Sequence, residues 1–563
     1  MTARLLAFLL TGVLAAPAQN LTPEQRAADL KMLAALYAKQ YGPYEWKRDV
    51  IGFDLYDLRP WLERAERISD DIEFMDLLVE YVASLDDAHD VVSFPFTFSA
   101  TLGFTADLYD GRALIDTISR ASLPFSQYPI SIGDELVSVD GIAVQEWIQR
   151  LWKYSTAANP RSTARNAVAR ITTRPQSRIP WAFRLGDTAQ VVIRHANGEV
   201  RTYTIPWVKT GAPVTEGGPV PSPFGRTAQQ SRAVSLLEYE DSLQPWQRPI
   251  AELLEARIDD TSMAVINPGL RPIFAMPQGF QTRLSGNAAT DSFFSGWWRV
   301  DELRVGFIRI PNMSPSLGTT AALQQFDREI AWMEENTDGL VIDVMRNPGG
   351  SVLYVENLCQ RLMPNLFRSI GFELRPTASE VASFGATLDS ARRSNLPDYM
   401  IAGYEARYND VLTAYRENRG RTGPISLTQH SLWLEPARTV YTKPIVVLID
   451  EFSASGGDAF PATLQDNQRA LLVGMRTMGA GGNVVDRNGT WYAEASTRVT
   501  RSLMHRRYEI ATPEFPSTPY IENVGVRPDV ELDYMTRENL LQNGRPFVEA
   551  FTAIAADYIR RNR

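Results

Sequence analysis

Short, continuous runs of apolar residues recur through the second half of this chain, and stretches with helical periodicity separate them. Fully apolar runs of this length are typical of strands that are buried on both faces of a sheet. The stretches at 320–334 and 351–362 repeat their apolar positions as amphipathic helices do. The runs that predict strands lie at 304–310, 339–344, 445–449 and 470–474. This alternation indicates an α/β fold with a mainly parallel sheet, whose functional sites are expected at the carboxyl ends of its strands.

The first half of the chain has a different pattern, in which helical periodicity comes first. Residues 23–87 are mostly helical in period and end in a polar turn at 86–90, which is followed by the extended segment 91–96. His89 lies in this turn, at the junction of two predicted domains, and functional side chains are often found on such connecting segments. His89 is therefore a candidate, although a single histidine is more often structural.

A second unit, over about 99–208, contains residues 132–141, which alternate as a strand between two glycine turns. This segment resembles the G-D-x-L-x-x-V-[ND]-G signature of PDZ domains. Leu102, Gly103 and Phe104 resemble the PDZ loop that binds the terminal carboxylate of a peptide through backbone N–H groups. A working peptide site and a PDZ-like unit that only braces the fold both remain open.

Length and charge predict a protein of several domains without a nucleic-acid partner. At 563 residues the chain is too long for one ordinary core. Its net charge of −9 and the lack of a basic block argue against nucleic-acid binding. We expect a signal peptide at 1–18, an N-terminal helical region carrying His89 at 19–98, a PDZ-like domain at 99–208, a connector at 209–300, a catalytic domain at 301–540 and a C-terminal helix at 541–563.

The N-terminus has the pattern of a secretion signal, because Arg4 precedes the apolar residues 5–10 and an A-x-A cleavage site follows at 16–18. We therefore expect a secreted or periplasmic protein. No later stretch is long and apolar enough for stable insertion into a membrane. Cys359 is the only cysteine, which leaves no intramolecular disulfide and no cysteine-based metal site, and we expect it to pack in the core.

The predicted strand at 445–449 leads into a turn of small residues that carries Ser455, and then into a helix. This order approximates the nucleophile-elbow pattern G-x-S-x-G, with Ser453 in place of the first glycine. Backbone N–H groups at the start of the helix would favour the oxyanion that forms beside a serine nucleophile. The alternatives are a loop that only caps an ordinary helix, and Ser453 as the nucleophile.

A second strand–turn–helix unit contains Gly349 and Gly350. Glycine lets the backbone approach a ligand closely, so Gly350 and Gly456 are candidates for the two N–H donors of an oxyanion hole. Taken alone, the turn that contains Gly349 and Gly350 could simply need glycine for a positive φ. The presence of the serine turn favours the functional interpretation.

Motifs at 306–310, 343–350 and 455–470 resemble, in the same order, those of the tail-specific (C-terminal processing) serine peptidase family. The resemblance implies a ClpP/crotonase-like α/β catalytic core within a multidomain α/β protein. The usual members use a serine–lysine dyad, with the lysine in a T-[FM]-G-K-G segment. Here Ala480 stands where that lysine belongs, and no lysine follows Lys443.

The chain resembles more closely the Ser–His–Glu branch of that family, to which the tricorn core protease and the chlamydial protease-like activity factor belong. That branch has a histidine just before its PDZ-like domain, as His89 is here, and an E-N-x-G-V-x-P motif, which matches residues 522–528. The resemblance implies that His89 is the base for Ser455 and that Glu522 orients His89. Asp87 and Asp90 are rival orienting groups.

Such a peptidase would form an acyl-enzyme on Ser455, need no metal or cofactor, and act on protein or peptide substrates, and a homodimer is compatible with the resemblance. Two other functions stay open. One is an α/β-hydrolase esterase, in which the base is His505 because it follows the serine in sequence. The other is a non-catalytic scaffold that binds peptides through its PDZ-like unit.

Overall fold

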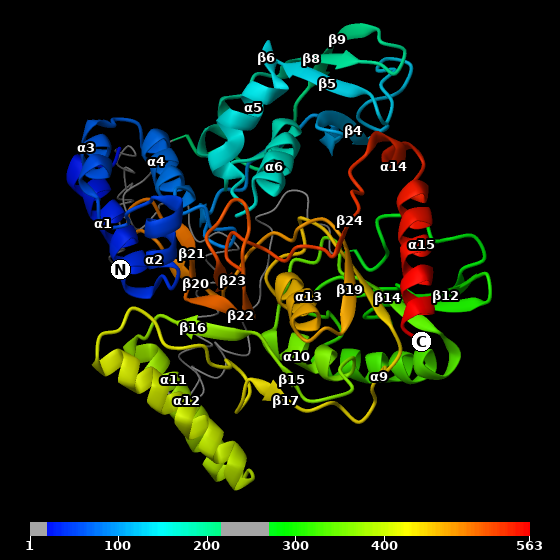
Figure 1. Cartoon of the computed structure of the whole chain (residues 1–563). Coiled ribbons are helices and arrows are strands. Elements are labelled where there is room, and N and C mark those ends of the chain that lie inside the picture. Colours follow the sequence, from blue (N-terminus) through cyan, green and yellow to red (C-terminus); the bar gives the residue numbers. More distant parts are fainter. Residues whose placement is uncertain (1–19, 216–268) are drawn as a thin grey trace, which may run out of the picture.

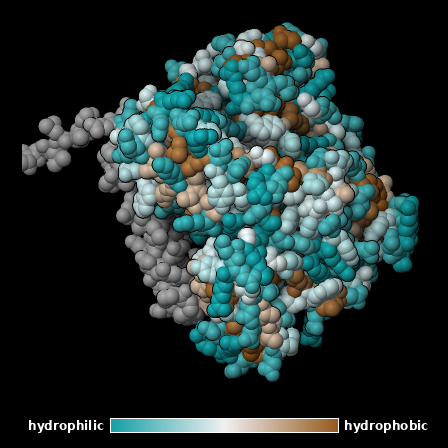
Figure 2. Space-filling model, turned by 60° about the vertical axis from the view of Figure 1, so that its left-hand side comes forward, coloured by the Kyte–Doolittle hydropathy of each residue, from teal (hydrophilic) through white to brown (hydrophobic). Residues whose placement is uncertain are grey.

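The computed structural model describes residues 20–215 and 269–563 (Figure 1). The expected signal peptide at 1–18 and the central part of the expected connector lie outside the described residues. Among the residues that are described, no helix is long and apolar enough to cross a membrane. The face shown in Figure 2 mixes hydrophilic and hydrophobic residues, with the hydrophobic ones in small separate groups.

A seven-stranded sheet forms the centre of the C-terminal half, and all four predicted strands belong to it. Its strands from β13 to β24 are parallel to one another, whereas β11 and β12 at one edge are antiparallel. In spatial order the strands are β11 (Gln281–Ser285), β12 (Phe294–Val300), β13 (Leu303–Arg309), β14 (Gly339–Asp343), β18 (Ile445–Ile449), β19 (Ala470–Gly474) and β24 (Val530–Glu531).

Helices cover both faces of this sheet, which explains why its strands are continuously apolar. The apolar cluster on one face includes residues of α9 (Thr319–Asn336), α10 (Val352–Gln360) and α13 (Gly456–Asp466). On the other face, Phe551 of α15 (Arg545–Arg561) belongs to the same cluster as Phe307 of β13. Cys359 is buried in the first cluster, as predicted.

The N-terminal region is helical, as the periodicity predicts. Its helices are α1 (Pro23–Gln40), α2 (Tyr44–Trp46), the π-helical turn Lys47–Ile51, α3 (Arg59–Arg67) and α4 (Asp71–Ala83). Helix α4 begins where the Asp70 side chain accepts a hydrogen bond from the N–H of Ile72, at 2.8 Å. The chain leaves α4 through Asp86, which has a φ of 47°, and reaches His89 three residues later.

The PDZ-like unit is a separate antiparallel sheet with two helices. In spatial order its strands are β3 (Phe104–Tyr109), β4 (Arg112–Ile118), β5 (Glu135–Val139), β8 (Thr188–Arg194) and β9 (Val200–Pro206), with β6 (Ile142–Ala143) beside β5, and its helices are α5 (Val144–Leu151) and α6 (Pro160–Thr172). The predicted turns on either side of β5 are confirmed, because Gly133 and Gly141 have φ values of 87° and 76°.

Small sheets join parts of the chain that are distant in sequence. Strand β1 (Val92–Ser93), just after His89, pairs with β21 (Ser496–Thr500) and so connects the His89 segment to the C-terminal half. The other small-sheet strands and remaining helices are β2 (Ser99–Thr101), β7 (Thr173–Pro175), β10 (Val208–Thr210), β15 (Phe367–Arg368), β16 (Gly371–Leu374), β17 (Trp433–Leu434), β20 (Val484–Asn488), β22 (Ser502–Ile510), β23 (Thr518–Tyr520), α11 (Ala378–Arg393), α12 (Asp398–Arg416) and α14 (Arg537–Leu541).

The central sheet contains a buried ion pair whose loss should destabilise the fold. Arg309 donates from Nη1 to Asp343 Oδ2 at 2.8 Å, and both side chains are fully buried. We expect Arg309→Met to leave Asp343 buried without its counter-charge and to lower the free energy of unfolding by about 3–5 kcal/mol, measured by urea titration. The control is Arg560→Met at an exposed pair, for which we expect little or no loss because solvent screens the interaction. Equal losses in the two variants would contradict this prediction.

Candidate active site

Ser455 lies in a tight turn between β18 and α13, as the nucleophile-elbow pattern predicts. Its backbone has a φ of 55° and a ψ of −111°, a positive-φ conformation outside the left-handed helical region that is uncommon for a residue other than glycine. Such conformations persist only where surrounding contacts hold them, and they are found preferentially at functional sites. The Ser455 N–H donates to Asp458 Oδ2 at 2.7 Å, one turn into the helix.

The Asp458 carboxylate joins the Ser455 turn to the segment that contains Ala480. Besides Ser455, it accepts hydrogen bonds from the N–H groups of Gly479 and Ala480, at 3.0 and 3.1 Å, and from the Thr477 hydroxyl. Burial raises the pKa of Asp458 to about 6, although these hydrogen bonds favour the ionised form. The position where the family's lysine is expected is therefore close to the Ser455 turn, but it carries only a methyl group.

Ser453, the rival nucleophile, is committed to a structural role. Its hydroxyl is fully buried, donates to the carbonyl of Val344 at 2.9 Å, and accepts from the N–H of Asp450 at 3.1 Å. These contacts hold the end of β18 against the end of β14. The geometry therefore favours Ser455 over Ser453 as the nucleophile.

The two glycine turns that were predicted to form an oxyanion hole lie side by side. A Cβ atom placed on Gly456 would be 3.2 Å from the backbone nitrogen of Gly350. A Cβ on Gly349, which has a φ of 93°, would approach to 2.7 Å of the Ser455 Cβ, so that position requires glycine. Within residues 20–215 and 269–563, neither Gly350 nor Gly456 donates its N–H to a protein acceptor. Both donors are available for a ligand.

The segment that carries His89 packs beside the Ser455 turn. Ala88 shares one small buried cluster with Ala454 and Ala480. His89 is itself buried, and its Nδ1 lies 4.0 Å from Asp87 Oδ1. Asp87 also accepts a hydrogen bond from the Tyr41 hydroxyl at 2.9 Å. The structure thus brings the His89 and Ser455 segments together.

Asp90, the other rival orienting group, points to a different part of the molecule. Its Oδ1 accepts hydrogen bonds from the N–H and the hydroxyl of Thr500, at 2.9 and 3.1 Å. Burial and the neighbouring Asp87 raise the pKa of Asp90 well above its usual value. These contacts give Asp90 a structural role at the end of β21.

Glu522 is fully buried and bound from two sides. Its Oε2 accepts the N–H of Gly481 at 2.8 Å, and its Oε1 contacts Lys47 Nζ at 2.5 Å. Burial and Asp87 raise the pKa of Glu522, while Lys47 and the Gly481 amide oppose that rise. Because Ala480 binds Asp458 and Gly481 binds Glu522, consecutive amides connect the Ser455 turn to Glu522.

Lys47 is a site residue that the sequence analysis did not identify. Its ammonium group donates to Glu522, to Asn523 Oδ1 at 2.6 Å and to the Asp86 carbonyl at 2.9 Å, so all three N–H bonds are used. Burial opposes the charge on Lys47, but Glu522 and Asp87 outweigh it and raise its pKa. Its signal in the sequence was that it is one of six lysines in an arginine-rich chain.

The other histidines have different surroundings. His505 Nδ1 contacts the Arg506 carbonyl at 2.7 Å, and its Nε2 lies 3.7 Å from Glu373. His195 contacts Asp134 and the Tyr203 hydroxyl, both at 2.8 Å, within the PDZ-like unit. These contacts do not connect either ring to the Ser455 turn.

The predicted carboxylate loop of the PDZ-like unit is partly engaged by the protein itself. The N–H of Leu102 donates to the Thr172 carbonyl at 3.0 Å, and the N–H of Gly103 donates to the Thr101 hydroxyl at 3.2 Å. Phe104 is buried at the start of β3. Two of the three predicted residues thus already use their N–H groups.

Comparison with known proteins identifies the two domains. Residues 304–532 match peptidase family S41, and residues 98–214 match the PDZ domain. The chain carries a serine-type peptidase domain of family S41. The predictions of a tail-specific serine peptidase and of a PDZ unit are therefore confirmed, and the protein is an enzyme that acts on proteins or peptides.

Relatives and solved structures match this chain over nearly its whole length. An uncharacterized protein of Chlamydia muridarum is 26% identical over 616 residues, which cover 97% of this chain and 94% of the relative. A protein of Chlamydia trachomatis is 26% identical over 589 residues, which cover 92% of this chain and 90% of the relative. The crystal structure of mature CPAF matches with a TM-score of 0.74 at 23% sequence identity. The match covers 96% of this chain and 98% of the CPAF chain. This likeness shows that the multidomain fold is shared.

The hydrogen bonds to Asp458 should be needed for the serine turn. We expect Asp458→Asn to turn an amide N–H₂ toward groups that are themselves donors, lowering the free energy of unfolding by about 3 kcal/mol, measured by urea titration, and reducing peptidase activity. The control is Asp486→Asn, at an exposed carboxylate paired with Arg498, which should change stability by about 0.5 kcal/mol or less. A stable, fully active Asp458→Asn enzyme would show that these bonds are dispensable.

Proposed function

We propose that this S41 peptidase is an endopeptidase that uses Ser455, His89 and Glu522 as a catalytic triad. The observation that carries the proposal is the connection of the three segments through one turn. The N–H of Ala480 donates to Asp458 beside Ser455, the N–H of Gly481 donates to Glu522, and Ala88 lies in the same buried cluster as Ala480. The proposal uses no group beyond the side chains and backbone amides of the chain.

In this mechanism His89 accepts the proton of the Ser455 hydroxyl as the oxygen attacks the carbonyl carbon of the scissile peptide bond. The resulting oxyanion is stabilised by the N–H groups of Gly350 and Gly456, each contributing about 3 kcal/mol to the transition state. His89 then donates the proton to the departing amine, which leaves an acyl-enzyme on Ser455. Water, activated by His89, hydrolyses this ester.

Glu522 serves in this proposal as the carboxylate that stabilises the protonated His89. Its contacts with Lys47 and Gly481 fix the position of the carboxylate. In its ionised form, such a carboxylate stabilises an imidazolium. Asp87, at 4.0 Å from the His89 ring, is the second candidate for the same role. Glu522→Gln and Asp87→Asn test these two assignments. The substitution that causes the larger loss of kcat identifies the carboxylate that stabilises the protonated His89.

The resemblance to the Ser–His–Glu branch also supports proposals about location and assembly. A signal peptide at 1–18 would direct the enzyme to a secreted or periplasmic location, and a homodimer is compatible with the branch. The loop of Leu102, Gly103 and Phe104 is proposed as a contact for a substrate's terminal carboxylate, which would have to compete with the partners that two of its amides already have. N-terminal sequencing of the exported protein and its mass in solution would decide the first two points.

The first test is substitution of the triad. Ser455→Ala and His89→Ala should each lower kcat for peptide hydrolysis by roughly 10⁵-fold, because triad residues act as a unit. Both variants should keep the circular dichroism spectrum of the parent enzyme. His505→Ala is the control and should retain activity, whereas the esterase alternative requires it to be inactive. Substantial turnover by Ser455→Ala would refute the proposal.

The second test uses pH. Lys47 lowers the pKa of Glu522, so Lys47→Met should raise that pKa and keep Glu522 protonated to a higher pH. If ionised Glu522 is required, the acidic limb of the kcat/KM profile should move to higher pH, by about 1–3 units. Lys47→Arg keeps the positive charge and should show a smaller shift. An unchanged profile for Lys47→Met would show that Glu522 ionisation does not limit catalysis.

A further inference from the structure

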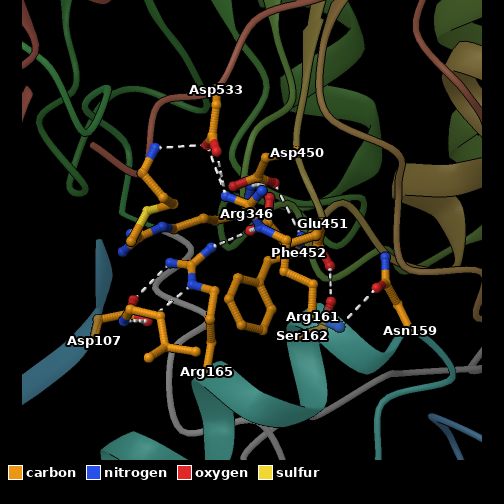
Figure 3. A network of polar contacts seen from close by, with 12 residues as sticks. Asp107, Asn159, Arg161, Ser162, Arg165, Arg346, Asp450, Glu451, Phe452 and Asp533 are labelled. Carbon is orange, nitrogen blue, oxygen red and sulfur yellow. Dashed lines mark hydrogen bonds and ion pairs between the residues drawn. The ribbon is translucent and has the colours of Figure 1, made fainter. Parts of the chain in front are cut away.

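Helix α6 of the PDZ domain reaches the residues that lead into the Ser455 turn. The chain leaves β18 at Ile449 and passes through Asp450, Glu451 and Phe452. Glu451 accepts from Arg165 Nη1 at 2.9 Å and from Arg161 Nε at 2.5 Å, and both arginines belong to α6 (Figure 3). Ionic contacts therefore cross from the PDZ domain to the catalytic domain four residues before Ser455.

Arg165 binds a second carboxylate on its opposite side. Its Nε and Nη2 donate to the two oxygens of Asp107 on β3, at 2.9 and 2.6 Å. Its guanidinium also lies over the Phe452 ring, with the carbon 4.5 Å from the ring centre. Asp107, Arg165 and Glu451 are all buried, so this row of charges is held in a low-dielectric interior where geometry is tightly constrained.

The pKa shifts of Glu451 and Arg165 agree with an ionic contact between the two side chains. Burial alone would raise the pKa of Glu451, but Arg165 and then Arg161 outweigh burial and hold it below its usual value. Burial would likewise lower the pKa of Arg165, and Asp107 and Glu451 raise it instead. Glu451 and Arg165 are therefore ionised, and removal of Arg165 would leave two buried carboxylates without that counter-charge.

Further bonds extend the contact to both turns beside Ser455. The Ser162 hydroxyl donates to the Glu451 carbonyl at 2.5 Å, and Asn159, at the start of α6, donates to the Thr477 carbonyl at 3.3 Å. Asp450 accepts the N–H of Arg346 at 2.7 Å, which links the same strand end to the turn that carries Gly350. A shift of residues 450–452 would therefore move both proposed oxyanion donors.

We propose that Arg165 is a positioning residue for catalysis, and that α6 is a permanent brace for the Ser455 turn through the row Asp107–Arg165–Glu451. The proposal rests on the proposed function of Ser455. It gives the PDZ domain a role in kcat that does not depend on a peptide in its groove. Misplacement of a reacting group by about 1 Å can cost roughly 100-fold in rate, so a small movement of the turn is sufficient.

The test is Arg165→Met, measured as kcat and KM per active site, with sites counted by titration with a serine-reactive fluorophosphonate. We expect kcat per titrated site to fall about 10–100-fold while KM stays within about twofold. Arg174→Met is the matched control. Arg174 is another buried arginine of the PDZ domain, and it stacks on Trp147 at 4.2 Å and Trp207 at 5.1 Å rather than on the catalytic domain. It should lower thermal stability but leave kcat per titrated site unchanged.

The outcomes separate this proposal from the one on which it rests. An unlabelled parent enzyme would contradict the serine mechanism itself. A labelled parent enzyme and an Arg165→Met variant with unchanged kcat per site would overturn only the brace. If Arg165→Met does not fold, Glu451→Gln replaces it, because the amide keeps the shape of the side chain and removes the charge. Unchanged kcat per site in Glu451→Gln would equally overturn the brace, and a fall of several-fold would support it.

Discussion

The positive-φ backbone of Ser455 is the constraint on which the rest of the candidate site depends. A residue with a side chain adopts this conformation at a cost of about 1–3 kcal/mol, so other contacts must hold it. Asp458 supplies them, because its carboxylate accepts the Ser455 N–H together with two amides and a hydroxyl of the 477–480 segment. One buried carboxylate thus fixes the serine and the turn beside it in the same step.

Two further buried ion pairs attach separate domains to this centre. Lys47 of the N-terminal region binds Glu522, and Arg165 of the PDZ domain binds Glu451. Such pairs add little net stability over apolar contacts, but removal of one partner is costly, so they favour a single arrangement of the domains. The site is consequently a product of three parts of the chain, and its geometry depends on how they pack.

The sequence was sufficient to predict four of the seven strands of the central sheet, because a strand buried on both faces needs a continuous apolar run, as at 445–449. The strands β11 and β12 at one edge of the sheet and β24 at the other edge were not predicted. The Ser455 turn was predictable for a similar reason, since strand, small residues and helix are local signals. Lys47 and Arg165 were not predictable, because their partners lie 475 and 286 residues away. Local periodicity contains no information about pairs at such distances, and nothing local distinguishes Glu451 from a surface carboxylate.

Ala480 is central to the proposal that the N-terminal region contributes to the catalytic unit. Its N–H donates to Asp458, and its methyl group lies in the same buried apolar cluster as Ala88 and Ala454. In the proposed mechanism the base comes from another segment, and the chain that contributes Ala88 to this cluster continues directly into His89. Under this proposal, the alanine at the position of the dyad lysine also belongs to the cluster that holds the histidine segment beside the serine turn. The lack of a lysine at 480 and the placement of the His89 segment are then two aspects of one packing arrangement.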